Sequence, residues 1–114
     1  MKAVFIELPP FERNRGHYLD DNAYRNFQNE ILKNPTSGDL IKGTCGLRKV
    51  RYKDERRRKG KRGGVRVIYY WWKEGSQFWL FTIYDKDEVT DLTKAELKLL
   101  ADLLKLEIKA RSLL

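Results

Sequence analysis

The spacing of apolar residues along the chain predicts a strand, a helix, three further strands and a final helix. Residues 3–7 (AVFIE) form a short run rich in β-branched and aromatic side chains, which is typical of a strand and stops before two prolines. From the capping pair Asp20-Asp21, apolar residues recur at the spacing of one helical face until Asn34-Pro35 ends the pattern. The predicted inner face of this helix comprises Ala23, Tyr24, Phe27 and Ile31.

Three strands are expected in the middle of the chain, at 47–52, 65–72 and 78–84, where β-formers are dense. Residues 73–76 (KEGS) predict a hairpin between the last two. These two runs are apolar at almost every position. Either both faces of the strands are covered, or their aromatic side chains line an exposed platform.

The C-terminal segment predicts a helix that begins with a capping box, Thr93-x-x-Glu96. Its leucines and isoleucine form two stripes, which is wider than packing on one sheet requires. We interpret the second stripe as a broad core face, with a surface for a protein partner as the alternative. The first stripe is Leu97, Leu100, Leu104 and Ile108, and the second is Leu99, Leu103 and Leu106.

Together these elements predict an α+β fold in which a small, mainly antiparallel sheet has one or two helices and the C-terminal helix packed on one face. A length of 114 residues fits a single domain over residues 1–114. Apolar and aromatic content, at 41% and 12%, is enough for a core despite 35% charged residues.

Positive charge is concentrated in one segment. The chain carries a net charge of +8, and a pI of about 9.7 favours a polyanionic partner. Residues 48–66 contain eleven basic and two acidic side chains, net +9, whereas the rest of the chain contains 13 basic and 14 acidic ones. The excess therefore belongs to this 19-residue segment.

Several classes of protein are not favoured. The N-terminal apolar run is too short for a signal sequence, and no apolar run is long enough to cross a bilayer. We therefore expect a cytoplasmic protein with no membrane partner. One cysteine, Cys45, can form neither an internal disulfide nor a cysteine-based zinc site, and we interpret it as a small residue near a turn.

Within the basic segment, strand alternation places Lys49 and Arg51 on one face of the predicted strand 47–52. A loop too charged and glycine-rich to be buried follows, and Arg66 comes just after it on the next strand. Arginine and lysine bind phosphate oxygens and release counterions, so this segment suits nucleic acid better than a solvated hairpin. The expected RNA- or ribosome-binding side chains are Arg48, Lys53, Arg56, Arg57, Arg58, Lys59, Lys61 and Arg62.

Common catalytic arrangements are absent from the sequence. His17 is the only histidine and is interpreted as a polar residue near a helix start, so a two-histidine ribonuclease is excluded. We interpret the acidic residues Asp85, Asp87, Glu88 and Asp91 as turns and caps rather than as a magnesium site. Nearby aromatic residues could stack bases, but most are expected in the core. Cations can stabilise a phosphoryl transition state, and we expect no metal or cofactor.

Three parts of the chain have a characteristic order and spacing: 46–51 (GLRKVR), 60–70 (GKRGGVRVIYY), and 80–88 (LFTIYDKDE) with 91–93 (DLT). Together they resemble the RelE superfamily of bacterial toxins, in its HigB-like branch. The resemblance covers Val4 to about Leu104 and is strongest from Gly46 to Leu92. It implies a microbial ribonuclease-like fold. It also implies an mRNA interferase that cleaves translated mRNA in the ribosomal A site, contacts rRNA and is inhibited by a co-encoded antitoxin.

By position, Lys49 and Arg51 resemble the family's basic pair on the second strand, Arg66 the arginine that opens the third, and Lys86 the basic residue after the fourth. Lys61 and Arg62 match the Lys-Arg-Gly-Gly segment of the branch. A C-terminal tyrosine or histidine, often a candidate acid or base in the family, is missing here. The general base is then Tyr84, Lys86 or Asp85, or catalysis depends on electrostatics and positioning by the ribosome.

Three functional hypotheses follow. The first is a ribosome-dependent endoribonuclease that uses metal-independent attack by the RNA 2′-hydroxyl. The second is a nonenzymatic RNA- or ribosome-binding module, for which the same basic segment suffices. A DNA-binding regulator is disfavoured, because no predicted helix is basic enough to read a major groove. We further expect a small helix-turn-helix antitoxin to contact the C-terminal helix and the exposed part of the sheet.

Overall fold

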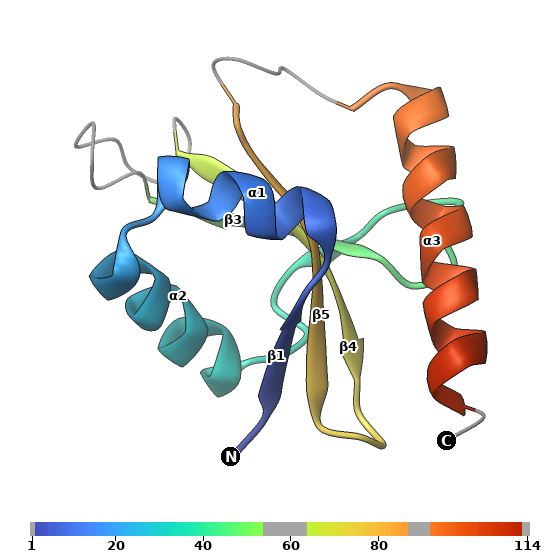
Figure 1. Cartoon of the computed structure of the whole chain (residues 1–114), viewed down its shortest axis with the longest axis horizontal. Coiled ribbons are helices and arrows are strands. Elements are labelled where there is room, and N and C mark those ends of the chain that lie inside the picture. The colour runs from blue at the N-terminus through green and yellow to red at the C-terminus, as the bar shows by residue number, and fades with distance from the viewer. Residues whose placement is uncertain (1, 54–63, 87–91, 113–114) are drawn as a thin grey trace.

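The computed structural model describes residues 2–53, 64–86 and 92–112, and its architecture is shown in Figure 1. The order of elements agrees with the sequence prediction, with one helix and one short strand added. The elements are β1 (Val4–Glu7), α1 (Pro9–Tyr18), α2 (Asp21–Lys33), β2 (Asp39–Leu40), β3 (Arg48–Tyr52), β4 (Val65–Trp72), β5 (Gln77–Asp85) and α3 (Lys94–Ser112).

Within the described residues, the sheet has five strands in the order β1-β5-β4-β3-β2. Of these described strands, only β1 and β5 form a parallel pair, with Val4 opposite Gln77, so β1 lies beside β5. The β3–β4 and β4–β5 pairs are antiparallel, as expected from the sequence. The α+β class with a mainly antiparallel sheet is thereby confirmed.

Helices cover both faces of the sheet, which corrects the expectation that all helices pack on one face. Side chains of α1 and α2, such as Phe11 and Phe27, share a core with Val67 and Leu80. Leu104 of α3 belongs to a second core on the opposite face. Figure 1 accordingly shows α3 apart from α1 and α2. The physical reason is that β4 and β5 are apolar on both faces, so each face needs its own cover.

The sequence leaves open whether a second helix precedes the central strands and does not locate α1, because its residues have no clear apolar repeat. Pro9 and Pro10, which predict the end of the first strand, also occupy the first positions of α1. A proline suits that position because its missing N–H has no acceptor in the first turn and its φ is already helical. Two buried side chains, Phe11 and Tyr18, then hold α1 on the sheet.

The predicted caps of the two other helices are confirmed. The Asp20 carboxylate accepts a hydrogen bond from the Ala23 N–H at 2.7 Å. In the capping box, the Glu96 N–H donates to the Thr93 hydroxyl at 3.1 Å, and the Thr93 N–H donates to the Glu96 carboxylate at 2.9 Å. No described helix is both long enough and apolar enough to span a bilayer.

The two apolar stripes of α3 have different surroundings. Leu100 and Leu104 are buried against Trp79 and Phe81, as predicted for the first stripe. The second stripe is exposed, which corrects its interpretation as a broad core face: Leu99, Leu103 and Leu106 are 66%, 39% and 63% exposed. A helix on one flat sheet face buries only the side chains that point toward that sheet.

Tyr69 links the segment between α2 and β2 to the centre of the sheet through hydrogen bonds. Its hydroxyl donates to the Pro35 carbonyl at 2.8 Å and accepts from the Gly38 N–H at 3.0 Å. A side chain at Gly38 would have its Cβ only 2.8 Å from the Tyr69 ring, so the close approach requires glycine. Burial raises the pKa of the Tyr69 phenol, which therefore stays a neutral donor.

Tyr69→Phe should lower the free energy of unfolding by about 1–3 kcal/mol, because it leaves a buried N–H and a carbonyl without their partner. Urea denaturation followed by circular dichroism measures this loss. Tyr70→Phe removes a hydroxyl from the opposite face of the same strand and should cost less. Equal losses for the two variants would show that the hydrogen bonds of the Tyr69 hydroxyl add nothing to the stability.

Candidate functional site

Three of the predicted catalytic residues form a row across the sheet. Arg51 of β3 lies opposite Arg66 of β4, and Arg66 lies opposite Tyr84 of β5. Directly opposed residues of neighbouring strands point to the same face, so the three side chains share the α3 side of the sheet. We call Arg51, Arg66 and Tyr84 the cross-strand row.

Arg66 is the centre of the row and is unusually well buried. The residue is 3% exposed and Tyr84 is 7% exposed, whereas Arg51 is exposed. Desolvation, and then the positive charge of Arg51, lower the pKa of Arg66, while Tyr84 acts in the opposite direction. An arginine nevertheless stays protonated at neutral pH. A buried arginine that faces a second cation makes this face of the sheet attractive to an anion.

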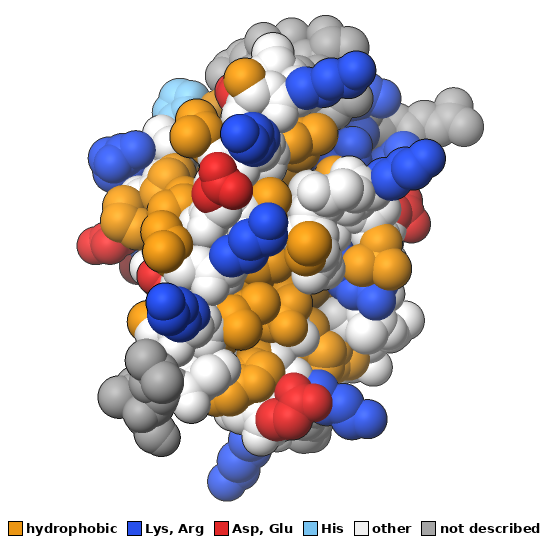
Figure 2. Space-filling model, turned by 90° about the vertical axis from the view of Figure 1, so that its right-hand side faces the viewer, with side chains coloured by type: hydrophobic (Ala, Val, Ile, Leu, Met, Phe, Trp, Pro, Cys, Tyr) orange, Lys and Arg blue, Asp and Glu red, His pale blue; other side chains and the backbone are white. Residues whose placement is uncertain are grey.

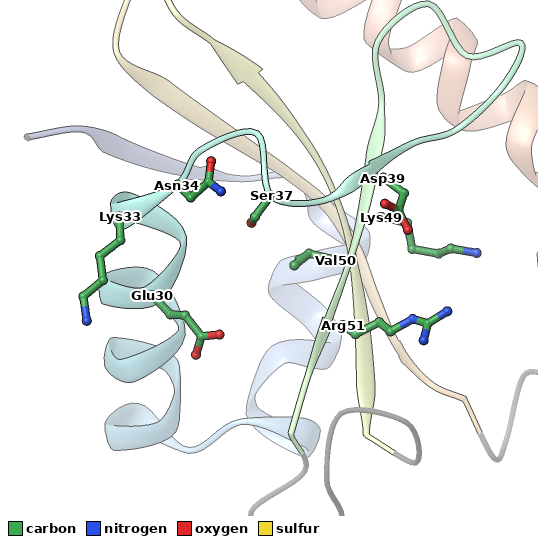
Figure 3. Close-up of a pocket in the computed structure, with 8 residues that line it drawn as sticks. All are labelled: Glu30, Lys33, Asn34, Ser37, Asp39, Lys49, Val50 and Arg51. Carbon is green, nitrogen blue, oxygen red and sulfur yellow. The ribbon is translucent and has the colours of Figure 1, made fainter.

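Lys49 lies next to the row but has an acidic neighbour. It points to the same face as Arg51, two positions along β3, and stands opposite Asp39 of β2. Both Lys49 and Asp39 line a hollow of about 390 Å³ between α2 and β3. In Figure 3, however, the charged ends of Lys49 and Arg51 point away from α2 and from Val50. The hollow is therefore not where these cations converge.

Lys86 follows β5 at the same end of the sheet. Its N–H donates to the Gly64 carbonyl at 3.4 Å, which places it beside the start of β4. Lys53 and Gly64 flank the basic loop, so both ends of the loop also adjoin the cross-strand row. The loop residues predicted to bind RNA, Arg56, Arg57, Arg58, Lys59, Lys61 and Arg62, lie outside the described residues.

Arg48 is separated from the other predicted site residues. Strand alternation directs it to the α2 side of β3, opposite Tyr69. Its guanidinium donates to the carbonyl oxygens of Gly38 at 2.8 Å and Thr36 at 3.1 Å. Arg48 therefore holds the same segment as Tyr69 and does not join the cross-strand row.

Among the three candidates for the general base, Asp85 is the least suitably placed. It is fully buried and pairs with Val65, so it points to the face opposite Tyr84. The other acidic residues of its predicted cluster, Asp87, Glu88 and Asp91, lie outside the described part of the chain. His17 is in the last turn of α1, three residues before the Asp20 cap, and is exposed.

One neighbour of the row could not be recognised from the sequence. A register shift between β4 and β5 places Thr82 opposite Ile68 and Leu80 opposite Tyr69, so Phe81 is an extra residue on β5. Thr82 thereby lies on the α3 face, two positions from Tyr84, and lines a hollow with Leu92 and Leu103. Simple alternation gives no signal for such a bulge.

No family model matches the chain. Among solved structures, the chain is similar to a double arginine mutant of the E. coli toxin RelE in the free state, with a TM-score of 0.50. The fold is RelE-like. The two chains are 14% identical, and the match covers 79% of this chain and 90% of that one. Identity this low concerns the fold alone, so the HigB-like branch stays a prediction.

Arg51→Gln should raise the melting temperature at low ionic strength, because it removes a charge that repels the buried Arg66. The gain should shrink with added salt, as the screening length falls from about 30 Å at 0.01 M to about 8 Å at 0.15 M. Differential scanning fluorimetry across a salt series measures this. Arg25→Gln, on the exposed side of α2, removes a charge far from the row and is the control. A lower melting temperature for Arg51→Gln would contradict the predicted repulsion.

Proposed function

We propose that this RelE-like protein is the toxin of a toxin–antitoxin system, an endoribonuclease that cleaves translated mRNA in the ribosomal A site. The observation that supports this most directly is the cross-strand row. Two arginines and a tyrosine face one side of the sheet, at the end from which the basic loop leaves and to which it returns. Similarity of fold to the toxin RelE adds to this argument.

The chemistry we propose is attack by an RNA 2′-hydroxyl on the adjacent phosphorus. The new O–P bond forms as the bond to the 5′ oxygen breaks, which yields a 2′,3′-cyclic phosphate and a 5′-hydroxyl. The 2′-hydroxyl loses its proton to a base, and the leaving oxygen takes one from an acid. Arg51 and Arg66 would stabilise the charge that develops on the phosphoryl oxygens, and no metal is needed for that step.

For the proton transfers we assign Tyr84, with Lys86 as the second group. Tyr84 lies opposite Arg66, so a phosphate held by the arginines would lie near the phenol. Lys86 is near the same end of β5. Lys49 would contact the RNA backbone beside the reacting phosphate, since it shares the face of Arg51. The mRNA and the surrounding rRNA are the polyanions for which the basic loop is suited.

Arg66→Ala should lower the single-turnover rate of mRNA cleavage on programmed bacterial ribosomes by about 10²–10³-fold, as expected for loss of one transition-state donor. Tyr84→Phe should lower it by about 10²–10⁴-fold if Tyr84 transfers a proton. Mapping of the 5′ ends of the products gives the cleavage site and the end groups. Arg25→Ala is the matched control, and circular dichroism verifies that each variant is folded.

The alternative, a nonenzymatic RNA- or ribosome-binding module, predicts a different outcome. In that case wild-type protein binds ribosomes without producing 5′-hydroxyl ends in the A site, and Arg66→Ala reduces binding and translational inhibition in parallel. An Arg66→Ala protein that binds ribosomes normally but does not inhibit translation supports the endoribonuclease hypothesis. Products with 5′-phosphate ends would contradict attack by the 2′-hydroxyl.

We also propose that the antitoxin, a small helix-turn-helix protein encoded beside this chain, covers the exposed stripe of α3. Leu99, Leu103 and Leu106 form a continuous apolar line on the surface. Leu99 and Leu103 also line a hollow of about 250 Å³ with Pro10 and Leu92. An exposed apolar groove of this kind suits an apolar side chain of a protein partner.

Leu99→Asp combined with Leu106→Asp should weaken antitoxin binding about tenfold or more, because a charge would have to be buried in an apolar contact. Co-purification of the two gene products, followed by calorimetry, measures this. Ser112→Asp introduces a negative charge on α3 away from the stripe and should bind normally. Normal binding by the double leucine variant would place the antitoxin elsewhere.

A further inference from the structure

A second positively charged surface lies on the far side of α3 from the exposed leucine stripe. A groove of about 430 Å³ runs between α3 and the loop that joins β2 to β3. Four lysines line it: Lys42 from the loop and Lys94, Lys98 and Lys105 from α3. Among the described residues that line the groove, Asp102 is the one acidic side chain. The lining therefore carries a net charge of +3.

The lysines of α3 converge because of helical spacing. Positions 94, 98 and 105 are separated by four and seven residues, so they lie on one face of the helix. The stripe of exposed leucines occupies another face. In Figure 2, which views the molecule from the α3 side, Lys and Arg side chains lie among apolar ones along this surface. The sequence outside 48–66 is nearly neutral overall, yet folding gathers these cations at one place.

The loop that forms the other wall has a defined conformation. The Thr44 side chain is buried, and its hydroxyl donates to the Ile41 carbonyl at 2.7 Å and accepts from the Leu47 N–H at 3.2 Å. Gly43 has a φ of +81°, in the left-handed region that favours glycine. Lys42 is therefore presented to the groove by a loop that is held in place.

We propose that this groove binds the phosphate backbone of RNA and is a second RNA contact, additional to the cross-strand row. The groove and the row are both on the α3 side of the sheet. Lys94 begins α3 two residues after Leu92, which packs in the same core as Tyr84. Lysine presents a point charge that suits a phosphate without reading a base. The groove would add affinity, and the row would carry out the chemistry.

An RNA backbone fits this groove better than an acidic polypeptide. Its lysines are spread along three turns of α3, which suits an extended ligand with regularly spaced charges. The apolar stripe expected to bind a protein faces another direction. The choice of RNA as the polyanion rests on the proposed function, whereas the binding of a polyanion rests on the charge of the groove alone.

The test measures binding of a short fluorescein-labelled single-stranded RNA by anisotropy over a series of salt concentrations. All proteins carry Arg66→Ala to suppress cleavage of the RNA. Lys98→Gln combined with Lys105→Gln should weaken binding and lower the slope of log affinity against log salt by about 1.4, because each phosphate that a lysine neutralises adds about 0.7 to the slope. Lys33→Gln combined with Lys73→Gln removes the same charge outside the groove, and should leave the slope almost unchanged.

The outcomes separate the groove from the proposed function. With Arg66 restored, the groove variant should cleave with a higher KM for ribosomes and an unchanged kcat. If wild-type protein does not cleave mRNA but the groove variant still lowers the salt slope, the proposed endoribonuclease activity is wrong and RNA binding by the groove is supported. Equal salt slopes for the groove and control variants would overturn the proposal that the groove binds RNA. So would a variant that binds RNA normally but loses affinity for polyglutamate, because the ligand would then be an acidic polypeptide.

Discussion

The arrangement of the molecule depends on the need to keep both faces of the β4–β5 pair from water. Tyr69, Leu80 and Ile83 are buried on one face, and Ile68, Trp79 and Phe81 on the other. One helix layer cannot satisfy both, so α1 and α2 cover the first face and α3 the second. The Arg111 guanidinium, which lies 5.2 Å from the centre of the Trp79 ring, closes the second core at its C-terminal end.

Against this apolar background, the cross-strand row is a local exception. Arg66 occupies a buried position and faces the charge of Arg51. Local rules of folding are commonly broken where a protein binds or reacts. The row and the lysines of α3 together make the α3 side of the molecule the one that would face a polyanion.

Much of this fold can be predicted from the sequence, because runs of strongly β-forming residues and helix-capping residues specify it locally. Strand β4 begins and ends where its composition predicts, and the Thr93-Glu96 capping box forms as expected. Strand alternation also places Lys49 and Arg51 on one face. Two features depend on tertiary structure instead. Helix α1 has no apolar repeat, and the register shift near Ile68 depends on how two strands twist together.

The parallel pairing of β1 with β5 also has a consequence for how the chain is made. Val4 has to pair with Gln77, 73 residues later in the sequence. Such non-local contacts form late, because closing a long loop costs entropy before any pairing offsets it. While only the first half of the chain has emerged during synthesis, β5 does not yet exist. The nascent protein therefore lacks its site until Tyr84 has been synthesised.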